Sequence, residues 1–456
     1  METTQPREAR RSYPLGIFGR TPPFTRRQGR VFLIACTAGF FDNYDRALLS
    51  LALKQIQKGL AIADAHLGAV LSLIRLGYIF SLLVTPLADV FGRRRLLLYT
   101  IAGYTIFTGL SAIAPSEHAF VACQAAARAF ACAEATIAVV ILAEEVDAAV
   151  RGWAVGLLAA VSTSGYGLAA LVFALINVMP YGWRGLYALA LIPLMLIIPL
   201  RRTLPESKRF AAEALPEIRP ARILEPLIAV FRAYPRRLGM LLAVAFLSAM
   251  GGNAAGIFFP KFLQEAHGWS PSQVASMFFI GGALGILGNI IAGRLSDRFG
   301  RRTMSSVFML LAPIMTIFLY RASAASALPG WSLALPLGLH LHLPRVPGVI
   351  PLWIFELFFD TASSTILTAY SAELFPTSHR ATAGSALAVA GTLGGALGLA
   401  LESVLYRASG SHWSAIRHLT IFWMIAPVIM FLFFPETAGS ELESIAPEAP
   451  SRQPAH

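Results

Sequence analysis

Long apolar runs of about 20 residues recur along nearly the whole chain and are separated by shorter polar segments. A run of that length crosses the hydrocarbon of a bilayer, about 30 Å thick, as one α-helix. The pattern therefore predicts an all-α membrane protein with twelve transmembrane helices. The predicted spans are 30–54, 66–88, 95–114, 119–143, 152–178, 183–200, 238–264, 272–294, 303–321, 345–372, 380–406 and 413–434.

The composition supports a polytopic membrane protein. Of the 456 residues, 56% are hydrophobic and only 14% are charged, and the mean hydropathy is +0.63. A soluble domain is normally far more polar. The first residues are polar and rich in Arg, so they resemble a cytoplasmic tail and not a cleavable signal peptide. All three cysteines fall inside predicted helices, which argues against a disulfide framework.

The positive charges are distributed unevenly between the two sides of the predicted helices. Most of the 37 Lys and Arg residues fall in the N-terminal tail, the central linker and the loops on the same side. Because cytoplasmic loops carry the excess of basic residues, both termini are predicted to be cytoplasmic. The chain has no Asn-x-Ser/Thr sequon, which favours a bacterial inner membrane. No basic stripe with aromatic residues suggests nucleic acid binding.

Three short motifs occur once in each half of the chain and in the same order. "LADVFGRRR" at 87–95 returns as "LSDRFGRRT" at 295–303, and "LPESKRF" at 204–210 matches "FPETAGS" at 434–440. Between them, a Glu stands seven residues before an Arg in each half. This duplication predicts two six-helix bundles. The predicted parts are an N-terminal tail (1–29), a first bundle (30–200), a linker (201–237), a second bundle (238–435) and a C-terminal tail (436–456).

These motifs resemble those of the major facilitator superfamily, in particular its sugar porters and metabolite:proton symporters. The family's loop signature G-x-L-x-D-R-x-G-R-R is met in full by 293–302, whereas the first copy has Thr85 and Val90 at two signature positions. The resemblance implies a secondary transporter that works by alternating access. It also implies a cytoplasmic gate made of Asp89, Gly92, Arg93, Arg94, Glu144, Arg151, Asp297, Gly300, Arg301, Arg302, Glu373 and Arg380. The alternative is that these charges only set the topology.

Charged residues also occur inside the predicted spans. The stretch "GFFDNYDRALLS" at 39–50 places Asp42, Asp45 and Arg46 on one face of the first helix. Arg75, Arg128 and Glu134 lie at similar depths in the second and fourth spans, and Glu356 and Asp360 lie near the middle of the tenth. A charge at the membrane centre costs roughly 2.5 to 3.5 kcal/mol on insertion scales, so such residues usually face a partner or a cavity.

The intramembrane acids outnumber the arginines by five to three, which suggests that one or two acids carry protons. We expect Asp45 to be the first candidate for proton coupling, followed by Glu134 and Asp42 and then by Asp360 and Glu356. The alternative is a set of permanently paired structural charges. No cofactor is expected, because the proton gradient would supply the energy.

The predicted substrate is a small organic acid held by arginine. The helix-1 "DR" resembles organic-anion symporters and the Asp-x-x-Asp resembles metabolite:proton symporters, although the Arg and Glu of the fourth span are six residues apart here and seven in those relatives. Arginine binds carboxylates through two hydrogen bonds. The candidate substrate-binding residues are Arg46, Arg75, Arg128, Tyr166, Asn253, Asn289 and Trp353.

Other functions remain open or are disfavoured by missing motifs. Proton-coupled efflux, sugar or polyol symport, and a non-transporting membrane sensor are alternatives to organic-acid uptake. The chain lacks a phosphate-binding loop and a catalytic signature, so an enzyme is not expected. His340 and His342 lie in a predicted loop with no Cys or acidic neighbour, so no metal site is expected. The expected partners are a small-molecule substrate, protons and the lipid bilayer, and the expected state is a monomer.

Overall fold

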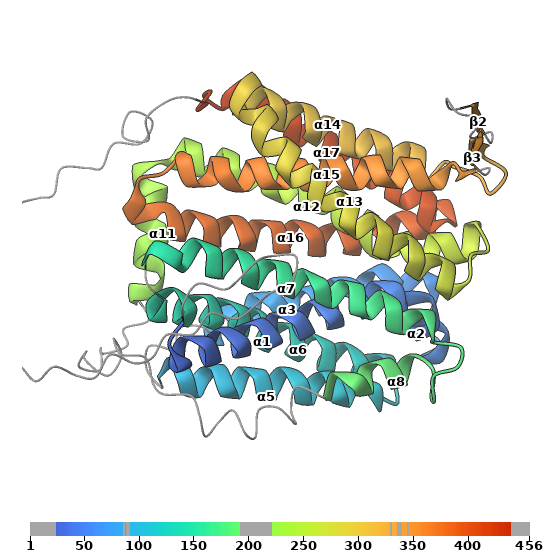
Figure 1. The fold of residues 1–456 in the computed structure, drawn as a ribbon, viewed down its shortest axis with the longest axis horizontal. Coiled ribbons are helices and arrows are strands. Elements are labelled where there is room, and N and C mark those ends of the chain that lie inside the picture. The colour runs from blue at the N-terminus through green and yellow to red at the C-terminus, as the bar shows by residue number, and fades with distance from the viewer. Residues whose placement is uncertain are drawn as a thin grey trace, which may run out of the picture. The chain divides into compact units, whose positions relative to one another are not determined.

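The structure is a computed structural model. It describes residues 24–84, 87, 92–146, 148–191, 221–328, 331–334, 340–343 and 346–438. Most of the predicted N-terminal tail, the C-terminal tail beyond residue 438 and a large part of the linker therefore lie outside the described residues. Helices make up nearly all of the described chain (Figure 1).

The helices before the linker follow the predicted spans. They are α1 (Arg26–Leu51), α2 (Leu53–Gly59), α3 (Asp64–Val84), α5 (Arg93–Ala112), α6 (Glu117–Glu145), α7 (Ala148–Ala174), α8 (Trp183–Ala188) and the 3-10 helix η3 (Leu189–Leu191). Helices α1, α3, α5, α6 and α7 correspond to the first five predicted spans. The sixth predicted span is described only as far as Leu191, as α8 and η3.

The helices after the linker also follow the predicted spans. They are α11 (Ala221–Ala233), α12 (Pro235–Ala266), α13 (Pro271–Phe299), α14 (Arg301–Leu319), α15 (Val349–Glu373), α16 (Thr377–Ser409) and α17 (His412–Phe433). Helix α11 occupies the end of the predicted linker. Helices α12 to α17 correspond to predicted spans seven to twelve, so the sequence periodicity located each of them.

The long connection between α14 and α15 contains two short antiparallel strand pairs. Strand β1 (Ala327–Leu328) pairs with β4 (Val346–Pro347), and β2 (Trp331–Ala334) pairs with β3 (His340–Leu343). The prediction of a plain loop around His340 and His342 was wrong, because both residues belong to β3. Alternating residues of a short Leu-rich run suit a strand as well as a loop, so the sequence pattern alone did not separate the two.

Local sequence signals explain where several helices begin and end. Thr25 accepts a hydrogen bond from the backbone N of Gln28, and the Gln28 side chain accepts one from the backbone N of Thr25, which forms a capping box at α1. Ser270 and Gln273 form the same box at α13. Gly410 ends α16 with φ of +67°, a conformation that glycine adopts without strain.

Among the described residues, seven helices are long and apolar enough to cross a membrane. They lie within α3, α7, α12, α14, α15, α16 and α17. The predicted all-α membrane fold is confirmed, with the two strand pairs as its small departure from pure helix.

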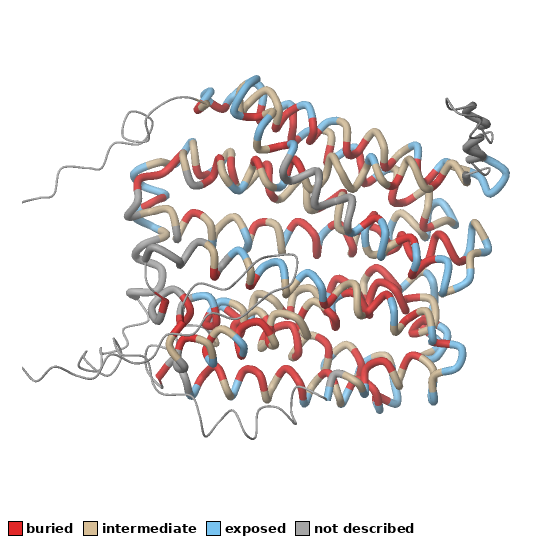
Figure 2. Tube along the Cα trace, in the orientation of Figure 1, coloured by how far each residue is buried: buried red, intermediate tan, exposed pale blue. Residues whose placement is uncertain are grey.

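The chain divides into two compact units. One comprises residues 1–56 and 76–218, and the other comprises 57–75 and 219–456. The N-terminal part of α3 therefore packs with helices of the second unit, although the sequence duplication assigns it to the first bundle. Within each unit, buried residues run along the helices (Figure 2).

Glycine allows one pair of helices in each unit to pack closely. A Cβ atom on Gly165 of α7 would overlap the carbonyl oxygen of Phe40 on α1. A Cβ atom on Gly398 of α16 would overlap the carbonyl oxygen of Met250 on α12. These two pairs are spans one and five and spans seven and eleven, so they occupy corresponding places in the two repeats. Small residues commonly permit such close approach in membranes.

Candidate functional site

Helix α1 carries the first part of the charged cluster of the first unit. Arg46 Nε donates to Asp42 Oδ1 over 3.0 Å, and the two residues are one helical turn apart. The Asp42 side chain is 4% exposed, whereas the Arg46 side chain is 40% exposed. The Arg46 guanidinium also lies 5.3 Å from the centre of the Tyr78 ring, a cation–π distance. Arg46 is thus held from two sides and still reaches open space.

Helix α6 provides the second part of this cluster. Arg128 Nη1 lies 2.8 Å from Asp45 Oδ2, and the two side chains are 2% and 0% exposed. Arg128 Nη2 also donates to the backbone oxygen of Asp45 and to Gln124 Oε1, at 3.3 and 3.2 Å. Gln124 in turn donates to Ser111 Oγ of α5 at 3.0 Å. This ion pair is therefore buried, and hydrogen bonds hold the arginine in one orientation.

Glu134, also on α6, differs from the other acids of the cluster because it forms no ion pair with a described residue. It is 1% exposed, and neither carboxylate oxygen has a hydrogen-bond partner among the described residues. Its electrostatic neighbours include the Asp42 carboxylate and the Tyr104 hydroxyl, which donates to the Phe41 backbone oxygen at 2.6 Å. An ionised carboxylate in such a place lacks both solvent and a counter-charge.

The charges of this cluster do not balance. In the described part of the first unit, the cluster contains three buried acids, Asp42, Asp45 and Glu134. Arg46 pairs with Asp42 and Arg128 pairs with Asp45, so Glu134 is left without a counter-charge. The cluster has a formal charge of −1 when all five groups are ionised. One proton on the acid without a partner brings it to zero.

The structure also describes other predicted substrate-binding residues. Arg75 belongs to the second unit, where it and Asn253 both lie against Gly395 of α16. Tyr166 lies on α7 in the first unit. Asn289 lies on α13, but its side chain is outside the described residues. Helical rise gives the depth of a side chain in the membrane but not its neighbouring helix, so the sequence did not predict the contact between Arg75 and Gly395.

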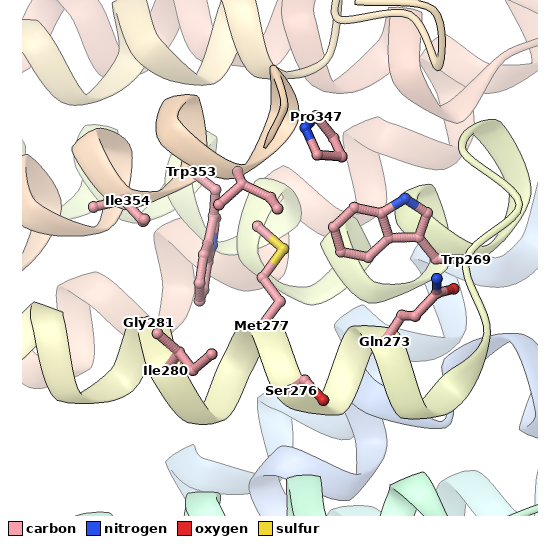
Figure 3. Close-up of a pocket in the computed structure, with 10 residues that line it drawn as sticks. Trp269, Gln273, Ser276, Met277, Ile280, Gly281, Pro347, Trp353 and Ile354 are labelled. Carbon is pink, nitrogen blue, oxygen red and sulfur yellow. The ribbon is translucent and has the colours of Figure 1, made fainter. Parts of the chain in front are cut away.

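Trp353 lines an apolar cavity in the second unit (Figure 3). The cavity has a volume of about 360 Å³, and Met277 of α13 lies between Trp353 and Trp269. Trp353 packs on Gly281 and stacks on Phe259 of α12 at 5.6 Å with 18° between the rings. The lining of the cavity is suited to a flat apolar group, and Gln273 and Ser276 supply polar atoms at one edge.

The two acids of α15 lie one helical turn apart in the second unit. Glu356 interacts with the hydroxyl of Thr316 on α14 and electrostatically with Asp360. The Ser363 hydroxyl donates to the backbone oxygen of Asp360 at 2.9 Å. They form a separate acidic pair in the second unit.

The predicted gate residues of the second unit meet at one end of α14. Arg301 forms an ion pair with Glu373 of α15 and donates to Asp297 at 3.3 Å. Its backbone N donates to Glu436 Oε1 at 2.7 Å, so Glu436 caps the start of α14. Arg302 also donates its backbone N to Glu436, at 3.2 Å, and Gly300 has φ of +97° at this turn.

The sequence analysis did not include Glu436 in this gate, and Arg380 makes a contact of its own. Arg380 stands seven residues after Glu373, but its Nε donates to the backbone oxygen of Phe375 at 3.1 Å. Thr437 completes the group by donating its hydroxyl to Glu373 at 2.7 Å. In the first half, Gly92 precedes α5 with φ of 91°, whereas Asp89 and the side chains of Arg93, Arg94, Glu144 and Arg151 lie outside the described residues.

Residues 35–343, more than half of the chain, match the Major Facilitator Superfamily. The chain belongs to this superfamily. It is therefore a multi-pass membrane transporter, and the resemblance seen in its loop motifs is confirmed.

Known proteins of similar length resemble this transporter over nearly its whole chain. It is 25% identical over 445 residues to the probable 4-methylmuconolactone transporter of Cupriavidus pinatubonensis, covering 92% of this chain and 95% of that one. It is 24% identical over 439 residues to the niacin transporter of Acinetobacter baylyi, covering 89% and 93%. A crystal structure of a bacterial homologue of the human lysosomal transporter Spinster matches with a TM-score of 0.70 and 17% identity, covering 90% and 97%. This last likeness concerns the fold alone.

The transporter also contains a second charged cluster, which the sequence analysis missed. We name it the His412 network, and it consists of Gln57, Asp64, Lys261, Glu265, Glu402 and His412. All six residues belong to the second unit. The only sequence signals were a Lys and a Glu four residues apart and an acid and a histidine near helix ends, which are common in helices.

Proposed function

We propose that this transporter takes up a small organic acid together with a proton, by alternating access. The observation that carries the proposal is the buried cluster of the first unit, in which three acids meet two arginines and Glu134 has no hydrogen-bond partner among the described residues. The remaining paragraphs assign the proton and the substrate to particular side chains.

Glu134 is the proposed proton carrier. Asp45 contacts a fully buried arginine, so protonating Asp45 would leave Arg128 as an uncompensated charge. Protonating Glu134 removes a charge that nothing balances, which relieves the cost of burying it. This arrangement favours Glu134 over Asp45, which remains the second candidate.

Arg46 is the proposed binding group for the substrate carboxylate. Its Nε and Nη2 hold Asp42, while its Nη1 has no protein partner among the described residues. Its side chain is exposed, unlike that of Arg128. A guanidinium that is already oriented loses less entropy when it binds a carboxylate.

The charge balance couples the two ligands. With Glu134 protonated the cluster is neutral, and a bound carboxylate brings it to −1. With Glu134 ionised the same substrate would bring it to −2, which a low-dielectric site disfavours. Proton and organic anion therefore bind together more readily than either binds alone.

The relatives support an organic acid as the substrate class. One is named as a probable 4-methylmuconolactone transporter and another as a niacin transporter, and niacin is a small ring that carries a carboxylate. The proposed location is a bacterial inner membrane with both termini in the cytoplasm. The proposed working state is a monomer that uses the proton gradient without a cofactor.

Uptake of nicotinate into proteoliposomes tests the proposal. We expect an inward proton gradient to drive accumulation above the level of protein-free liposomes, and Arg46→Gln to raise the KM at least about tenfold through the loss of a charge-assisted hydrogen bond. Nicotinamide has the same ring without the carboxylate and is the matched control. Uptake that ignores the gradient would contradict the coupling, and equal handling of acid and amide would contradict the role of Arg46.

A further inference from the structure

The His412 network joins residues of five helices, α2, α3, α12, α16 and α17, around one imidazole. His412 Nδ1 lies 2.6 Å from Glu402 Oε1 of α16, and its Nε2 lies 3.1 Å from Asp64 Oδ1 of α3. Lys261 of α12 lies 3.3 Å from the same Asp64 oxygen and 2.9 Å from Glu265. Among the described residues, the titratable groups in contact with His412 are Glu402, Asp64 and the ring of Tyr406, which stacks on it at 4.3 Å.

The network is buried at its centre and open at one edge. Glu402 is 0% exposed and Lys261 is 2% exposed, whereas the Asp64 side chain is 47% exposed. The rings of Phe258 and Tyr406 cover the imidazole. Water can therefore reach Asp64 but not the contact between His412 and Glu402.

The geometry of the network calls for one proton more than a neutral imidazole carries. Asp64 Oδ1 already accepts from Gln57 at 2.7 Å and from Lys261, which is the behaviour of an ionised carboxylate. A neutral histidine donates through only one ring nitrogen. Both ring nitrogens face carboxylate oxygens, so the second contact needs a proton on either His412 or Glu402.

Loss of this proton would set a nitrogen lone pair against a carboxylate oxygen inside the protein. Such a contact is repulsive, and no water is available to relieve it. The contact that can open most readily is the one to Asp64, because that carboxylate is already half exposed.

Asp64 belongs to the segment 57–75, which packs on α16 beyond the network. The Ser72 hydroxyl donates to the backbone oxygen of Ala396 at 2.7 Å, and Ser403 Oγ accepts from the backbone N of Ala69 at 2.9 Å. The remainder of α3 belongs to the first unit. This segment is thus the part of the first sequence repeat that associates with the second unit.

We propose that Glu402, His412 and Asp64 form a proton-binding site whose proton holds residues 57–75 against α16 and α17. The site is distinct from Glu134, and it stands whether or not Glu134 carries a coupled proton. When the proton leaves, the contact to Asp64 opens and the segment is released.

Spin labels on the two sides of the site test the proposal without any transport measurement. The labels replace the exposed residues Ala63 and Ala408 in a background whose three native cysteines are changed to serine. We expect one short distance at about pH 5 and a growing second, longer distance toward about pH 8. Above the pH at which the proton is released, the ratio of molecules with residues 57–75 held to molecules with them released falls by up to about tenfold for each further pH unit.

Two variants and one control separate the proton from general packing. In Glu402→Gln the amide can donate to His412 Nδ1 while Nε2 donates to Asp64, so the segment stays held at every pH. In His412→Gln the distances no longer depend on pH. His418→Gln changes an exposed histidine on the same helix and should behave like the parent protein. The proposal fails if the parent distances do not change with pH, or if both network variants respond to pH as the parent does.

Discussion

Helix α6 in the first unit and α15 in the second are the fourth and tenth spans, so the duplication gives them corresponding places. They differ in what they present to their neighbours. Arg128 of α6 forms a buried ion pair with Asp45 of α1, the first span. Trp353 of α15 stacks on Phe259 of α12, the seventh span. The fourth span thus contacts the first through a buried ion pair, and the tenth contacts the seventh through aromatic rings.

This difference indicates how the two halves divide their tasks. A buried ion pair rarely adds net stability, because desolvation offsets the attraction between the charges. Stacked aromatic side chains contribute to packing without that cost. We therefore expect the aromatic contact of α15 to serve packing, and the ion pair of α6 to be retained for a functional reason.

The largest expected effect comes from breaking the ion pair of the first unit. Asp45→Asn leaves Arg128 buried without a counter-charge, so we expect a loss of about 3 to 5 kcal/mol in the free energy of unfolding. Unfolding in detergent with increasing sodium dodecyl sulfate measures it. Asp42→Asn is the matched control, because its partner Arg46 is exposed and water can solvate it. Similar losses for the two variants would show that burial does not distinguish the pairs.

A smaller effect is expected from crowding the aromatic site of the second unit. In Gly281→Ala the added Cβ would overlap the Trp353 ring, and overpacking of this kind typically costs about 1 to 3 kcal/mol. Gly282→Ala is the control, since no atom lies within 4 Å of its Cβ position. Trp353→Phe should restore much of the loss in Gly281→Ala because the smaller ring leaves room. Melting temperatures of the two alanine variants, of Trp353→Phe and of the double variant Gly281→Ala with Trp353→Phe check this. Equal melting temperatures of the two alanine variants would count against tight packing.

The smallest effect is expected at the exposed end of the gate. Asp297 lies 3.3 Å from Arg301, but its side chain is 67% exposed. Exposed pairs one helical turn apart contribute about 0.3 to 0.5 kcal/mol, so Asp297→Asn should leave the melting temperature nearly unchanged. Glu373→Gln should lower it more, because Glu373 is largely buried and binds both Arg301 and Thr437. The reverse order would contradict this description of the gate.

The sequence predicted the helices and part of the site well. Apolar runs located the spans, and the four-residue spacing of Asp42 and Arg46 suggested their contact before the structure placed them together. The rise per residue along a helix also predicted that Arg128 and Glu134 lie at depths similar to those of Asp42 and Asp45. These successes share a cause, because each depends on period and rise within one helix.

The failures concern partners on different helices. Rise along a helix does not say which neighbour a side chain faces, so the sequence did not predict that Arg75 lies against Gly395. The His412 network escaped notice because Asp64 and His412 are 348 residues apart. Each of its members alone resembles an ordinary charge near a helix end.

The central claim is that Glu134 carries the coupled proton, and Glu134→Gln tests it most directly. Two rates are measured with the same proteoliposomes: gradient-driven accumulation of nicotinate, and exchange of labelled for unlabelled nicotinate without a gradient. A permanently neutral side chain keeps the cluster uncharged, so exchange should persist while accumulation falls at least about tenfold. If Glu134→Gln accumulates nicotinate as the parent does, Glu134 is not the proton carrier.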